Sequence, residues 1–241
     1  MFSPKTGSVE FGELVPARFV QRDNRFVARV KYQDKIHLAH LANPGRLEEL
    51  LTPGQKLWIR PVQDPDRKTH FDVVLVELAQ TLVSVNSQLP NRIVGRALDA
   101  GILPGLREIQ NVRREVRRGH SRIDFMVAEK NHTHWIEVKS VTLVVAGTAM
   151  FPDAPTKRGA RHLHELSEIV QEGGRATVVF VIQRDDAEAF IPNETMDPAF
   201  AAALRSAAEA GVEIRAWRCW VTPKGIGLDS AVPVCLDSPI S

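Results

Sequence analysis

Residues 121–125 read Ser-Arg-Ile-Asp-Phe, residues 136–139 read Ile-Glu-Val-Lys, and these two stretches decide how the chain is interpreted. Polar and apolar side chains alternate in both, which is typical of β-strands with one buried face. Glu137 and Lys139 therefore share one face of their strand. If the two strands pair as a hairpin, Asp124 lies beside Glu137 on the same polar face.

Asp124, Glu137 and Lys139 together predict a catalytic site for phosphodiester hydrolysis. Two adjacent carboxylates supply the hard oxygen ligands that Mg²⁺ and Mn²⁺ prefer, and such an ion lowers the pKa of a bound water. The ammonium of Lys139 can position that water or stabilise charge that develops on the phosphorus. The alternative is an ordinary exposed ion pair between Glu137 and Lys139. The spacing alone does not decide between them, because it also arises by chance.

A helix is predicted from about Thr156 to Glu172, and Gly173-Gly174 ends it. Arg158, His162 and Glu165 fall on one face of this helix, away from its apolar stripe. Since a helix N-terminus attracts anions, we expect Arg158 and His162 to bind a DNA phosphate. The alternative is a polar face that only meets solvent.

The remaining elements of residues 83–241 complete a mixed sheet flanked by helices, in the order α-β-β-β-α-β-α-β. The apolar run Ala176–Gln183 predicts a strand buried on both faces. Asp197-Pro198 predicts the start of a third helix. The other expected elements are a helix over Asn91–Ala100 and strands over Val112–Arg118, Arg122–Ala128, His134–Val141 and Val212–Cys219.

Residues 1–82 predict a separate domain of short strands. We expect strands over Leu14–Val20, Phe26–Lys31, Ile36–Leu41, Leu57–Pro61 and Phe71–Leu78, with a short helix over Leu47–Leu51. This is the element order of an OB-type barrel. Arg22 and Arg25, interleaved with Phe19 and Phe26, suit a nucleic-acid backbone with stacked bases. The alternative is that both phenylalanines belong to the barrel core.

The composition excludes several classes of protein. The chain has 241 residues, of which 44% are apolar and 25% charged, as in ordinary globular proteins. No apolar run is long enough to span a bilayer, no signal-peptide core follows Met1, and the two cysteines form no CxxC motif. We therefore expect a cytoplasmic protein without disulfides or membrane contact. Without HExxH, GxSxG, P-loop or GxGxxG motifs, several enzyme classes lose their usual support.

Charge is unevenly distributed, although the net charge is only +2. Residues 14–35 and 107–122 each carry a net charge of +4, whereas residues 185–241 carry −5. Two basic segments and an acidic C-terminal third favour one cationic face turned toward an anionic polymer. Arg122, in the second segment, is expected to contact DNA. The alternative is that both segments are solvated faces. We expect the carboxylates to lie in a positively charged cleft sized for a duplex.

Five strings carry a family resemblance: Val85-Asn-Ser87, Ser121-Arg-Ile-Asp-Phe125, Ile136-Glu-Val-Lys-Ser-Val-Thr-Leu143, Phe151-Pro-Asp153 and Arg158-Gly159. The sequence resembles the sugar fermentation stimulation protein A family over nearly its whole length. This resemblance implies a mixed α/β fold, with an OB-like β-barrel over 1–82 and a PD-(D/E)xK nuclease-like domain over 83–241. It implies that Asp124 and Glu137 hold Mg²⁺ or Mn²⁺ and that Lys139 is the catalytic lysine.

The resemblance also implies a protein that binds DNA largely without sequence specificity and regulates sugar (maltose) metabolism. A metal-dependent DNA nuclease is the alternative function. Because the barrel is of a kind that also binds RNA, RNA stays open as a second partner. The sequence does not determine the oligomeric state.

Two departures from the family pattern concern the first helix and the start of the second helix. Where relatives often carry a metal-binding glutamate on the helix over residues 91–100, this chain has Arg96, so Glu115 is the substitute candidate for a third metal ligand. Lys157 replaces an acid before Arg158 and increases the local positive charge. A helix-turn-helix has been suggested for the region that corresponds to 198–219. We expect a strand after Gly211 instead, and an acidic recognition helix would repel phosphate.

Overall fold

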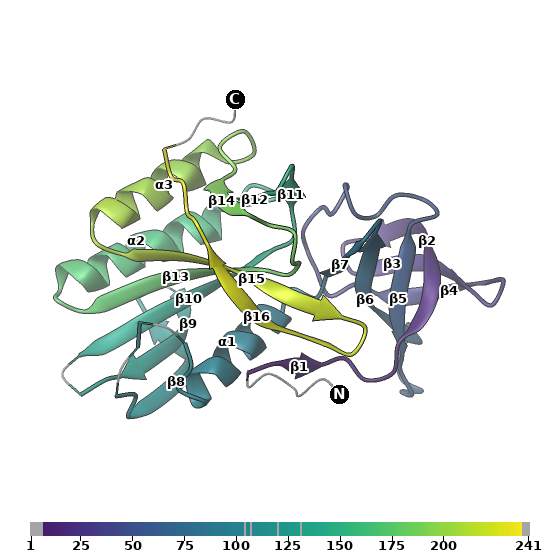
Figure 1. Ribbon diagram of the computed structural model, residues 1–241, viewed down its shortest axis with the longest axis horizontal. Helices are drawn as coiled ribbons and strands as arrows, with labels where there is room; N and C mark the ends of the chain where they lie inside the picture. Colours follow the sequence, from purple (N-terminus) through teal and green to yellow (C-terminus); the bar gives the residue numbers. More distant parts are fainter. Residues whose placement is uncertain (1–6, 104, 107, 120, 131, 238–241) are drawn as a thin grey trace.

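The computed structural model describes residues 7–103, 105–106, 108–119, 121–130 and 132–237. Figure 1 shows two domains: a β-barrel at the right and a twisted sheet flanked by helices at the left. No helix among the described residues is long and apolar enough to cross a membrane.

The barrel confirms the OB-like prediction. Its strands are β2 (Val15–Asn24), β3 (Val27–Tyr32), β4 (Lys35–His40), β5 (Lys56–Pro61), β6 (Phe71–Leu78) and β7 (Thr81–Ser84), in the spatial order β4-β3-β2-β5-β6-β7. A parallel pairing of β4 with β6, with Ala39 opposite Phe71, closes the barrel. The predicted boundary after residue 82 falls inside β7, which pairs with β6.

Alternation along the strands gives the barrel its core. Phe19, Val30 and Leu57 are buried, while Phe26 is 47% exposed, so only one of the two phenylalanines is a core residue. The predicted helix over Leu47–Leu51 is wrong: the segment makes a hydrogen-bonded turn, because Leu47 adopts a left-handed conformation (φ 53°) that interrupts helical geometry.

The second domain is built on a seven-stranded sheet in the order β1-β16-β15-β13-β10-β9-β8. Its strands are β1 (Val9–Glu10), β8 (Asn111–Arg118), β9 (Ser121–Ala128), β10 (Thr133–Val141), β13 (Arg175–Ile182), β15 (Glu213–Thr222) and β16 (Gly225–Val232). The central strands β10, β13 and β15 are parallel. Because β1 pairs with β16, the first described residues complete this sheet rather than the barrel.

Helices cover both faces of the sheet. α1 (Leu89–Asp99) packs on one face, while α2 (Lys157–Gln171) and α3 (Pro198–Glu209) pack on the other (Figure 1). Each face therefore has its own apolar core. The chain continues from α3 into strand β15, which confirms the expectation that the C-terminal region is not a helix-turn-helix.

A small sheet that the sequence did not predict lies between the two domains. It consists of β11 (Val144–Val145), β12 (Thr148–Phe151) and β14 (Ala189–Pro192). Its strands have two to four residues, too short for an alternating pattern to identify them.

Two backbone amides of the barrel domain form hydrogen bonds with the second domain. The amide of Ser84 donates to the carbonyl of Gln183 at 3.0 Å. The amide of Arg46, in a barrel turn, donates to Oδ2 of Asp153 at 3.1 Å. Gly45 permits this approach, since a Cβ there would lie 2.1 Å from the Asp153 oxygen. These contacts fix the barrel turn against the second domain.

Candidate metal and nucleic-acid site

The hairpin of β9 and β10 places Asp124 between its own strand and the next. The two strands pair as far as Ile136 opposite Phe125. Beyond that pair, a side chain replaces the backbone as the hydrogen-bond partner: Oδ2 of Asp124 accepts a hydrogen bond from the Val138 amide at 2.7 Å. Its Oδ1 accepts a bond from Asn91 Nδ2, on α1, at 2.6 Å. Asp124 is thus held rigidly at the position where the strands diverge.

Glu137 and Lys139 lie on the adjacent strand, as the alternation predicts. Lys139 Nζ lies 2.6 Å from Glu137 Oε1, in an ion pair whose side chains are only 11% and 4% exposed. The alternative of an exposed surface pair is therefore wrong. Glu137 Oε2 is buried and has no hydrogen-bond partner among the described residues. A buried carboxylate oxygen without a partner is costly, and a bound cation would satisfy it.

The pKa values of the two carboxyl groups differ. Burial, followed by the charge of Glu137, raises the pKa of Asp124 to about 6. Burial also acts to raise the pKa of Glu137, but Lys139 and His162 outweigh it, and the pKa of Glu137 falls below its usual value. At neutral pH both groups are then ionised, and together they present a concentrated negative charge.

His162 lies behind Glu137 instead of on the surface predicted from the helix pattern. Its side chain is 2% exposed, and its Nδ1 contacts Glu137 Oε1. Its Nε2 accepts a hydrogen bond from Nε of the exposed Arg158 at 3.2 Å. With both ring nitrogens engaged and the ring buried, His162 cannot reach a phosphate in this conformation. Arg158 remains a candidate phosphate contact at the start of α2.

Glu115 and Arg122 lie apart from the carboxylate pair. Their side chains are 55% and 65% exposed and approach each other at 3.8 Å. In the part of the chain that the structure describes, no three His, Cys, Asp or Glu side chains converge as a metal site. Glu115 therefore does not complete a three-ligand set, because its exposed carboxylate is turned to Arg122 and solvent.

Helix α1 contributes Asn91 to the site, which the sequence reasoning missed. Arg96, the position where a helix carboxylate was sought, contacts the carbonyl of Ser8 instead. Asn91 is the first residue of the helix predicted over Asn91–Ala100 and lies on its polar side. This helix begins shortly after the domain junction, and that position was the sequence signal for a role of Asn91 in the site.

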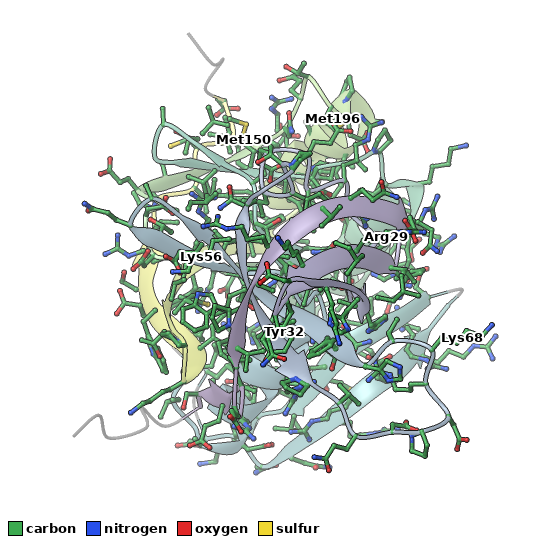
Figure 2. The ribbon with its side chains drawn as sticks, turned by 90° about the vertical axis from the view of Figure 1, so that its right-hand side faces the viewer. Arg29, Tyr32, Lys56, Lys68, Met150 and Met196 are labelled. Atoms are coloured by element: carbon green, nitrogen blue, oxygen red, sulfur yellow. The ribbon has the colours of Figure 1, made fainter. Side chains whose placement is uncertain are left out.

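A cleft of about 1070 Å³ leads to Lys139 from the barrel side. Its barrel wall includes Asn24, Arg25 and the turn over 43–46, and its other wall includes Lys139, Thr142 and residues 150–156. Figure 2 looks onto the barrel and shows Met150, a lining residue, above the barrel strands. The charged lining residues are Arg22, Arg25, Arg46, Lys139, Glu48 and Asp153, so cations predominate.

Arg22 and Arg25 differ in how far they are available to a ligand. Arg22 uses its five N–H groups on main-chain carbonyls of Asn24, Arg25, Asn43, Gly45 and Arg46, at 2.7–3.1 Å. It therefore braces the barrel turns, and none of its donors is left for a phosphate. Arg25 is exposed at the cleft.

These features define a class: a two-domain protein in which an OB-type barrel faces a mixed sheet that is flanked by helices and carries an Asp, Glu-x-Lys constellation. Comparisons with known proteins agree. The family model for the SfsA N-terminal OB domain matches residues 20–85. The family model for the sugar fermentation stimulation protein RE domain matches residues 88–225. The chain belongs to the sugar fermentation stimulation protein (SfsA) family, as its sequence strings predict.

Relatives match along nearly the whole chain. The sugar fermentation stimulation protein homolog of Chloroflexus aurantiacus is 48% identical over 92% of this chain and 85% of its own. The homolog of Moorella thermoacetica is 46% identical over 92% and 97%. A solved structure, Pyrococcus furiosus SfsA in complex with Ca²⁺, superposes with a TM-score of 0.86 at 31% identity, covering 94% of this chain and 97% of that one.

Proposed function

We propose that this protein is a cytoplasmic DNA-binding protein that hydrolyses phosphodiester bonds with Mg²⁺ or Mn²⁺. The observation that carries the proposal is the buried pair Asp124 and Glu137, with an unpartnered carboxylate oxygen and the Lys139 ammonium beside it. Burying two acids next to each other raises the free energy of the fold unless a cation compensates them. A catalytic requirement explains why such a pair is kept.

Asp124 and Glu137 are the residues that would hold the metal. Mg²⁺ usually retains several waters and takes only one or two protein carboxylates, so two carboxylates suffice. The name of the Pyrococcus furiosus structure includes Ca²⁺, another hard cation that takes oxygen ligands. When bound, the metal supplies Lewis acidity and lowers the pKa of a bound water.

The other residues would act by position and charge. Asn91 and the Val138 amide hold the Asp124 carboxylate in one orientation, and His162 does the same for Glu137. Lys139, at the end of the cleft, places a positive charge where negative charge develops on the phosphoryl oxygens. Arg25, which lines the cleft, and Arg158, exposed at the start of α2, would hold the DNA backbone.

The names of the relatives favour a second candidate function. A protein that stimulates sugar fermentation fits a DNA-binding regulator of sugar (maltose) metabolism, in which the nuclease-like scaffold serves only to contact the backbone. Both candidates share the binding step. They differ in whether Lys139 takes part in a reaction.

Plasmid DNA that carries a single-stranded gap, incubated with the purified protein and Mn²⁺ or Mg²⁺, separates the two candidate functions. We expect cleavage that EDTA stops and that Lys139→Ala and Asp124→Asn abolish while DNA binding persists. Lys224→Ala, which removes an exposed lysine from the turn between β15 and β16, is the matched control and should cleave normally. DNA binding without cleavage would support the regulator, and the absence of both would reject the proposal.

A further inference from the structure

The volume of the cleft and the side chains near it bear on which form of DNA reaches Lys139, an inference that rests on the proposed function. Pockets of roughly 300–1,000 Å³ bury one drug-sized ligand, and the cleft has about 1070 Å³. That volume fits a few nucleotides of one strand. A B-form duplex is much larger, since its major groove alone is about 12 Å wide, and we expect it to remain outside the cleft.

Both walls of the cleft are held in place. The barrel turn over 43–46 is bonded to Asp153 through the Arg46 amide and braced from within the barrel by Arg22. At the end of β7, Ser84 is hydrogen-bonded to Gln183 of the second domain. To admit a duplex, the domains would have to break these contacts and separate. A single strand needs no such opening.

The charges of the cleft suit a single backbone that runs between the domains. Arg25 and Arg46 are exposed on the barrel wall, and Lys139 lies on the opposite wall. A strand between them meets cations on both sides, whereas Glu48 and Asp153 are the only acids among the lining residues that the structure describes. Phosphate contacts of this kind hold a strand without reading its sequence.

An aromatic side chain is available for the bases at the same end of the barrel. Phe26 directly follows Arg25 and is 47% exposed. Its backbone is fixed: its amide donates to Asn24 Oδ1 at 2.9 Å, and its carbonyl accepts from the Leu41 amide at 2.9 Å. Phe26 is not itself a lining residue of the cleft, but it is the sequence neighbour of Arg25, which is. An exposed aromatic ring of this kind offers a face on which an unpaired base can stack.

We propose that the substrate strand is single-stranded DNA, or the unpaired end of a duplex, which enters between Arg25 and Lys139 with a base stacked on Phe26. Paired bases offer no free face to this ring, so the duplex portion remains outside the cleft. The protein then acts on tails, gaps or frayed ends and not along an intact helix.

Fluorescence anisotropy in EDTA, at one fixed salt concentration, tests the proposal. The probes are a labelled single strand of about 15 nucleotides, within the site sizes of OB folds, a blunt duplex of equal length, and that duplex with a single-stranded tail. We expect the single strand and the tailed duplex to bind more tightly than the blunt duplex. Phe26→Ala should weaken their binding by about 5- to 150-fold, the equivalent of one lost base stack.

Two further variants make the outcome specific. Phe26→Trp should retain binding. Ile36→Ala, which truncates another exposed apolar side chain, 53% exposed on β4 and outside the cleft, should leave it unchanged. A blunt duplex that binds as tightly as the single strand, or a Phe26→Ala variant that binds like wild type, would overturn the proposal and leave DNA binding intact. Single-stranded RNA that binds more tightly than DNA would overturn the assignment to DNA. If no probe binds, the proposed function itself fails.

Discussion

A single histidine ring determines which oxygen of Glu137 is left without a partner. His162 and Lys139 both contact Oε1, and this leaves Oε2 buried and unpartnered beside Asp124. His162 is itself held by Arg158, which donates to the other ring nitrogen. The order Arg158, His162, Glu137 is thus a chain of contacts from the surface of α2 to the carboxylate that we propose as a metal ligand.

We predict that His162→Ala weakens Mn²⁺ binding by about 10- to 100-fold, because residues that orient a metal ligand typically contribute that much. Isothermal titration of Mn²⁺ into the variant measures this. His164→Ala is the control, since His164 lies two residues further along α2 with a side chain that is 77% exposed. Equal affinities in the two variants would show that His162 does not orient Glu137.

The raised pKa of Asp124 gives the metal-free protein a pH-dependent stability. Since the pKa is about 6 in the folded state against 3.8 in the reference state, the folded state holds this proton more tightly. The free energy of unfolding therefore falls as pH rises from about 4 to 6. We predict that Asp124→Asn unfolds with a free energy about 1–3 kcal/mol higher than wild type above pH 6, and that the difference disappears near pH 4. Urea denaturation in EDTA measures it, and a difference that does not vary with pH would contradict the assignment.

At the scale of elements, the sequence predicted the strands that show polar–apolar alternation and the helices that show capping residues. The barrel strands, the hairpin of β9 and β10, and α2 and α3 all follow from periodic patterns and turn residues. Leu47–Leu51 and the small sheet did not follow, because a run of two to five residues fits more than one period. The position of the Glu115 side chain could not be predicted from the sequence either, because Glu115 adopts a positive φ (53°) within β8 that is set by the tertiary structure.

Asp197 connects two of these elements. Its Oδ1 accepts from the Phe200 amide at 3.0 Å and caps α3, and its Oδ2 accepts from the Thr156 amide at 2.7 Å at the start of α2. We predict that Asp197→Ala lowers the free energy of unfolding by about 1–3 kcal/mol, because both helix ends lose a partner. Asp197→Asn keeps a capping oxygen and should lose less. Urea titration compares the two, and an equal loss would contradict the capping role.

At the scale of the whole molecule, the proposed function depends on a cleft that both domains line and that Lys139 reaches. The sequence predicted the strands that carry Asp124, Glu137 and Lys139 and a positively charged cleft, but not that residues of both domains line the cleft. A cleft of this kind depends on long-range contacts such as Arg46 with Asp153, which no local pattern reports. The same limit explains Arg22: its charge was visible in the sequence, but its five internal hydrogen bonds were not.

Arg25 and Arg22 should therefore respond differently to removal. We predict that Arg25→Ala weakens DNA binding, reduces the dependence of log affinity on log salt by about one phosphate contact, and leaves the stability unchanged. Arg22→Ala should lower the free energy of unfolding by about 2–5 kcal/mol, since it leaves several carbonyls without donors. Salt titrations and urea denaturation of both variants check this, and a stable Arg22→Ala variant with weakened DNA binding would reverse the assignment.

The most direct measurement of the central claim is a crystal structure of the protein soaked with Mn²⁺, with the anomalous signal recorded. The account predicts an ion between the carboxylates of Asp124 and Glu137, with Glu137 Oε2 as one of its ligands and Lys139 beside it. An anomalous map without a peak at that position, or with Mn²⁺ bound only elsewhere on the chain, would contradict it.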